Sequence, residues 1–77
     1  MSRLFEVDIK ELRAAMAETG IYTAKGLADR LGVSRNTAET LLNGKRYPST
    51  AIMQGLVDLL SLDGERAGRI FFARKLA

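Results

Sequence analysis

Recurrent start and stop signals divide this chain into short helical segments. Gly20, Gly32 and Gly44 each close a segment whose apolar residues have helical spacing, and glycine accepts the left-handed backbone on which many helices end. Soon after each glycine comes a residue whose side-chain oxygen can cap the next helix. These signals predict an all-α fold, a compact bundle of about five helices.

The expected helices follow from the caps. They begin after Asp8, Thr23, Ser34, Ser49 or Thr50, and Asp63, and they end at Gly20, residue 31, residue 43, about residue 60 and about residue 73. The first start resembles a capping box, since Glu11 stands three residues after Asp8. Two segments keep alternatives open. Residues 4–7 are an extended lead-in or a strand, and Phe71-Phe72 lie in the last helix or in a short terminal strand.

Length and composition exclude most classes of site. Seventy-seven residues form one domain, 1–77, and the chain has no cysteine and no histidine. Disulfides, thiol chemistry, imidazole catalysis and nearly every zinc site are thereby excluded, and no cofactor is implied. The central segment has only the carboxylates Asp29 and Glu39, which form no acid–base or metal constellation. We therefore expect no enzyme activity.

No membrane segment and no export signal are expected. The apolar runs are too short to span a bilayer, and residues 1–6 lack the apolar stretch of a signal peptide. A cytoplasmic protein without a membrane partner follows, and no small-molecule ligand is expected.

The positive charge is concentrated in the middle of the chain. The net charge of the whole sequence is +3. Residues 21–50 hold five cations against Asp29 and Glu39, which equals the entire excess. A localised basic zone is the electrostatic footprint of a phosphate-binding surface, although a solvated surface of mixed charge has the same composition.

Residues 23–43 meet the physical demands of a helix-turn-helix. Two helices that cross at a steep angle need a small residue at their contact, which Ala28 supplies. The turn needs a left-handed residue, Gly32, before Ser34 caps the following helix. Apolar residues take the inward positions of that helix. The outward positions are polar, as a wet groove requires: Arg35, Asn36, Thr37, Glu39 and Thr40.

An ordered set of residues in and after this region carries a family resemblance. The set is Leu27-Ala28, Leu31-Gly32-Val33-Ser34-Arg35, Leu42-Asn43-Gly44-Lys45-Arg46, Pro48-Ser49, Leu56 and Leu59-Leu60. It resembles the helix-turn-helix family of phage repressors and Cro proteins (the xenobiotic-response-element type) over roughly residues 9–62. The ends of the chain resemble small regulators of phages and integrated elements. One departure is Ala24-Lys25, where the family usually has a glutamine.

The resemblance implies a repressor-like or Cro-like transcriptional regulator that binds double-stranded operator DNA in the bacterial cytoplasm or nucleoid. In the docking geometry of this motif, the start of the second helix enters the major groove. Base contacts are therefore expected from Arg35, Asn36, Thr37 and Thr40. Phosphate contacts are expected from Thr23 and Lys25 at a helix start, and the resemblance implies them for Asn43, Lys45 and Arg46.

A second copy of the chain is the expected partner. One recognition helix reads only about 4–5 base pairs, so specific binding usually needs a two-fold dimer on an inverted repeat. Residues 61–77 carry more apolar side chains than a tail needs, and we expect Ile70, Phe71 and Phe72 to contribute to the dimer contact. Packing of Phe71 or Phe72 on the chain's own core is the alternative. An excisionase or architectural recombination factor, and an antitoxin-type protein-binding module, remain alternative functions.

Overall fold

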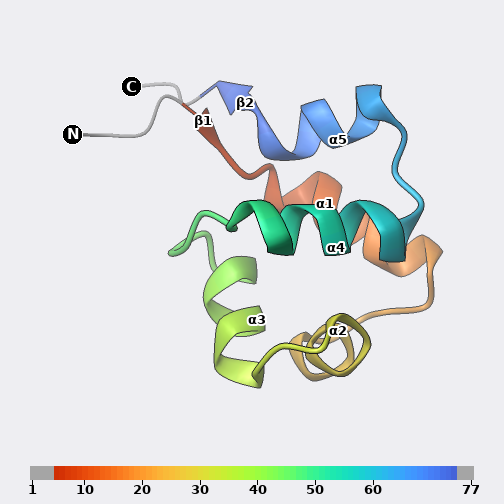
Figure 1. Cartoon of the computed structure of the whole chain (residues 1–77), viewed down its shortest axis with the longest axis vertical. Helices are drawn as coiled ribbons and strands as arrows, with labels where there is room; N and C mark the ends of the chain where they lie inside the picture. Colours follow the sequence, from red (N-terminus) through yellow and green to blue (C-terminus); the bar gives the residue numbers. More distant parts are fainter. Residues whose placement is uncertain (1–4, 75–77) are drawn as a thin grey trace.

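Five helices and one two-stranded sheet make up the part of the chain that the structure describes. The structure is a computed structural model, and it describes residues 5–74 (Figure 1). The elements are β1 (Phe5–Glu6), α1 (Ile9–Glu18), α2 (Ala24–Leu31), α3 (Arg35–Leu42), α4 (Thr50–Leu60), α5 (Gly64–Phe71) and β2 (Ala73–Arg74). The prediction of an all-α bundle of five helices is confirmed. No helix within residues 5–74 is long and apolar enough to cross a membrane.

The sheet joins the two ends of the described chain. β1 and β2 are antiparallel, with Phe5 opposite Arg74 and Glu6 opposite Ala73. The fifth helix ends at Phe71, before the expected end near residue 73, because Ala73 must be extended to pair with β1. Of the two interpretations of residues 4–7, the strand is correct for Phe5 and Glu6.

Side-chain caps begin all five helices at the predicted positions. Asp8, Thr23, Ser34, Ser49 and Asp63 each accept a hydrogen bond from the backbone N–H three residues ahead. Ser49, rather than Thr50, is thus the cap of α4. The capping box at α1 forms only in part. The Asp8 N–H donates to the Ile70 carbonyl oxygen at 2.7 Å, and the Glu11 carboxylate instead binds Arg66.

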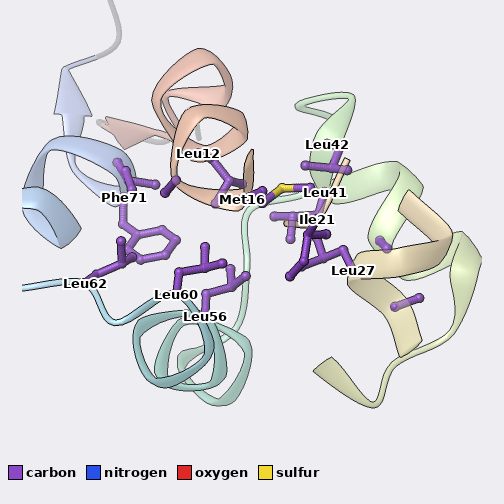
Figure 2. Packing of buried hydrophobic residues seen from close by; sticks show 14 residues of the cluster. Leu12, Met16, Ile21, Leu27, Leu41, Leu42, Leu56, Leu60, Leu62 and Phe71 are labelled. Atoms are coloured by element: carbon purple, nitrogen blue, oxygen red, sulfur yellow. The ribbon is translucent and has the colours of Figure 1, made fainter. Parts of the chain in front are cut away.

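The apolar core runs the length of the molecule between two groups of helices. Figure 2 shows Phe71, Leu62 and Leu60 at one end, where α1, α4 and α5 meet, and Ile21, Leu27 and Leu41 at the other, beside α2 and α3. Among residues 5–74, the buried core cluster consists of Leu12, Ala15, Met16, Ile21, Leu27, Ala28, Ala38, Leu41, Leu42, Leu56, Leu60, Leu62, Ile70 and Phe71. One continuous core therefore holds the α2–α3 pair against the other three helices.

A close approach between α2 and α4 fixes the position of α2. Gly55 of α4 faces Leu31 of α2, and a Cβ atom at Gly55 would lie 2.9 Å from Leu31 Cδ1. The absence of a side chain at Gly55 therefore lets the two helices come together at this point.

An ion cluster joins α5 to α1 on the surface. The Arg66 guanidinium donates to both carboxylate oxygens of Glu18 at 2.7 Å, and its Nε donates to Glu11 at 3.0 Å. The Arg66 side chain is 23% exposed and that of Glu18 61%. These hydrogen bonds lower the pKa of the Glu18 carboxyl and raise the pKa of Arg66.

Candidate nucleic-acid interface

The α2–α3 pair lies at one end of the molecule, away from the sheet (Figure 1). Gly32 has φ 78°, the left-handed conformation that the sequence predicts for the turn, and Ser34 caps α3. Ala28 and Ala38 are 4% and 0% exposed. A small residue therefore occupies the inner side of each helix, and Arg35 and Asn36, which directly follow Ser34, are exposed.

The outward face of α3 has a charged part and a hydroxyl part. The Arg35 and Glu39 side chains are 68% and 48% exposed, and their Nε and Oε2 atoms lie 3.8 Å apart. Asn36 is exposed. Thr37 and Thr40 are half-buried. Arg35 and Asn36 are thus the most exposed of the residues expected to read bases.

Both threonine hydroxyls are engaged within α3. Ser34 Oγ donates to Thr37 Oγ1 at 2.8 Å, and Thr40 Oγ1 donates to the Thr37 carbonyl oxygen at 3.0 Å. Thr37 Oγ1 accepts in its bond, so its hydrogen can still be donated to a base edge, and Thr40 Oγ1 donates in its bond, so it can still accept a hydrogen bond. Each methyl group also remains available for an apolar contact.

The start of α2 presents backbone donors and one cation. Thr23 Oγ1 accepts a hydrogen bond from the Gly26 N–H at 3.0 Å. The N–H groups that precede Gly26 in the first turn have no partner within the helix. Lys25 Nζ lies 3.9 Å from Asp29 Oδ2, and both side chains are largely exposed. An exposed pair at this distance is weak, so Lys25 can exchange Asp29 for another anion at little cost.

The corner after α3 carries two adjacent cations. Gly44 has φ 73°, the left-handed conformation. The Gly44 N–H donates to the Leu41 carbonyl oxygen, and the Lys45 N–H donates to the Thr40 carbonyl oxygen. These bonds end α3 at a glycine. Lys45 and Arg46 are exposed, and neither has an ion-pair partner among residues 5–74. Asn43, the C-cap, is exposed beside them.

This geometry agrees with the comparison to known families. The helix-turn-helix domain family matches residues 10–69. The chain belongs to the helix-turn-helix domain family. No curated protein matches the chain. The motif binds double-stranded DNA, and DNA binding is the function that family membership supports.

In this helix-turn-helix protein, the predicted dimer residues are divided by their burial. Ile70 and Phe71 are 0% and 2% exposed within the single chain, whereas Phe72 is 52% exposed. The structure therefore reassigns Ile70 and Phe71 to the core, because α5 turns them toward α1 and α4. Of the three, only Phe72 offers a surface to a second chain.

Two tyrosines near the motif were missed by the sequence analysis. Tyr22 directly precedes the cap of α2 and is 72% exposed, and an aromatic residue in a polar interhelical turn was the available signal. Tyr47 follows Arg46, and its hydroxyl donates to the carbonyl oxygen of Phe71. No local pattern signals this second contact, since the two residues are 24 positions apart.

Proposed function

We propose that this protein is a sequence-specific transcriptional regulator that binds an operator in double-stranded DNA through the major groove and, Cro-like, represses by blocking polymerase. The observation that carries this proposal is the arrangement of α3 and the corner after it. Arg35 and Asn36 project from the first turn of α3, and the exposed cations Lys45 and Arg46 follow its last turn. A polar surface that can contact bases thus lies beside two cations that can bind the DNA backbone.

The proposed roles separate base reading from backbone binding. Arg35 would donate two hydrogen bonds to guanine O6 and N7, and Asn36 would bond adenine N6 and N7. Thr37 and Thr40 would offer methyl groups to thymine or share their hydroxyls. Backbone phosphates would be held by Thr23, Lys25, Asn43, Lys45 and Arg46.

We further propose that the protein binds as a homodimer through the sheet end of the domain. The rings of Phe5 and Phe72 meet edge to face, with centroids 5.6 Å apart, and Phe72 is half exposed. Glu6 and Arg74 are exposed on the two strands. A two-fold contact needs a self-complementary patch, and here each chain would offer an aromatic surface, one anion and one cation.

The position of the sheet supports this arrangement. It lies toward the opposite end of the molecule's longest axis from α2 and α3 (Figure 1), and that axis measures 33 Å. A contact at the sheet end would leave both α3 helices uncovered and hold them apart, as binding to two separate half-sites requires.

Selection of bound sequences from a random DNA pool tests the proposal. We expect an inverted repeat whose half-sites are one helical turn apart. Arg35→Ala should relax the preference at one base position, whereas Lys45→Ala should weaken binding to all sequences about equally. Recovery of no enriched sequence would refute specific DNA binding, and a single unrepeated half-site would refute the dimer.

A further inference from the structure

The loop between α3 and α4 has firm anchors at its two ends. On the α3 side, the backbone N–H groups of Gly44 and Lys45 are bonded to carbonyls of α3. On the α4 side, Pro48 is buried and Ser49 caps α4. Lys45 belongs to the first anchor and Arg46 directly follows it, so the path of the loop toward Pro48 helps to decide where the Arg46 side chain points.

The loop is not backed by packed side chains along its whole length. A cleft separates it from β1 and the start of α1, and its lining residues include Glu6, Asp8, Arg46 and Tyr47. Beside Arg46 the loop therefore borders open space rather than packed side chains. A specific bond from the loop to another element adds a restraint to the anchors at its two ends.

Tyr47 supplies that bond. Its hydroxyl donates to the carbonyl oxygen of Phe71, the last residue of α5. The last four carbonyls of a helix have no intrahelical donor, so Tyr47 caps α5 with a side chain from the loop. At the same end of α5, the Ile70 carbonyl accepts from the Asp8 N–H, and β2 begins at Ala73. The end of α5 is thus shared by the loop, the start of α1 and the sheet.

We propose that Tyr47 is a positioning residue. It holds the loop so that Lys45 and Arg46 can bind the DNA backbone, and it couples this binding to the C-terminal end of α5. Neither its aromatic ring nor its hydroxyl needs to touch DNA for this role. The inference deepens the proposed DNA-binding function and rests on it. Coupling is reciprocal, so DNA bound at the loop should also steady the last turn of α5.

The test compares Tyr47→Phe with wild type for binding to a random-sequence duplex across a range of salt concentrations. The variant removes only the hydroxyl. Thr19→Val is the matched control, since Thr19 Oγ1 likewise donates to a backbone carbonyl, that of Ala15, at 3.3 Å. For Tyr47→Phe we expect affinity to fall about three- to tenfold. The slope of log affinity against log salt should shrink by up to about 0.9 for each phosphate that the protein no longer neutralises.

The salt slope separates positioning from a general loss of stability. A merely structural role lowers the folded fraction but leaves the slope of the folded protein unchanged, as we expect for Thr19→Val. In a Lys45→Ala/Arg46→Ala background, Tyr47→Phe should have no further effect on affinity. An unchanged slope, or a full additional decrease in affinity in that background, would overturn the inference.

A second measurement uses the wild-type chain alone. Hydrogen exchange at the Phe72 N–H, which bonds the Gly68 carbonyl at 2.9 Å, should slow when the duplex is added. Unchanged exchange in the presence of saturating DNA overturns the coupling, while slower exchange supports it. If wild type binds no duplex at all, the proposed function itself fails, which distinguishes that result from a failure confined to Tyr47.

Discussion

The salt dependence of DNA binding is the most direct consequence of the charge arrangement around α3. Lys45 and Arg46 have no ion-pair partner among the described residues, and Lys25 has only an exposed partner at 3.9 Å. If each neutralises one phosphate, a dimer releases the counterions of about six phosphates, and log affinity falls with log salt at a slope of roughly −5. Between about 50 and 200 mM salt, affinity should then fall on the order of 1,000-fold.

Lys45→Ala changes this slope by a calculable amount. The variant removes one phosphate contact per protomer, so the dimer slope should weaken by about 1.8, and the same rise in salt should then lower affinity only about 85-fold. Fluorescence anisotropy with a labelled duplex at several salt concentrations measures both slopes. Arg30→Ala is the control, because Arg30 is a cation in the last turn of α2, outside the proposed contacts.

Two results would refute the reasoning. A wild-type slope near zero would mean that phosphate neutralisation does not drive binding. An Arg30→Ala slope reduced as much as that of Lys45→Ala would mean that the general charge of the domain, rather than the corner after α3, binds the backbone.

Three further predictions concern stability. Gly68 lies inside α5 with nothing within 4 Å of an added Cβ, so Gly68→Ala should raise the free energy of unfolding by about 0.5–1 kcal/mol. Gly44 has φ 73°, so Gly44→Ala should lower the free energy of unfolding by about 1 kcal/mol. Urea denaturation of the two variants measures both changes. The pKa of Glu18 is lower in the folded chain than its ordinary value near 4.5, so ionised Glu18 stabilises the fold above about pH 4.5, and this stabilisation is lost as the pH falls through the lowered pKa. Glu18→Gln should flatten that part of the curve of stability against pH, and an unaltered curve contradicts the ion cluster. Phe71→Ala should cost about 3–5 kcal/mol and unfold much of the protein, while Phe72→Ala should leave the monomer folded and weaken self-association in analytical ultracentrifugation.

Local chemistry accounts for the parts that sequence reasoning predicted well. A cap acts on an N–H group three residues ahead, and Gly32 ends a helix through its own φ of 78°. Such signals need no knowledge of the rest of the chain. The five helix starts and the orientation of α3 followed from them.

The errors and omissions arise from contacts between distant segments. The end of α5 was misplaced because β2 pairs with β1, which lies at the opposite end of the described chain. The roles of Glu11 and Arg66 were missed because the two are 55 residues apart. A helical pattern identifies apolar residues such as Phe71 and Phe72, but not which of two neighbours the other helices will cover.

From its sequence alone, this chain was expected to form capped helices, to use residues 23–43 as a helix-turn-helix and to gather its basic residues in the middle third. Tertiary packing was needed to establish that Arg66 binds Glu11 and Glu18, which phenylalanine stays exposed and that Tyr47 reaches α5. The physical reason is range. Caps, turns and helical periodicity act within about four residues, whereas burial and ion pairing depend on segments that only packing brings together.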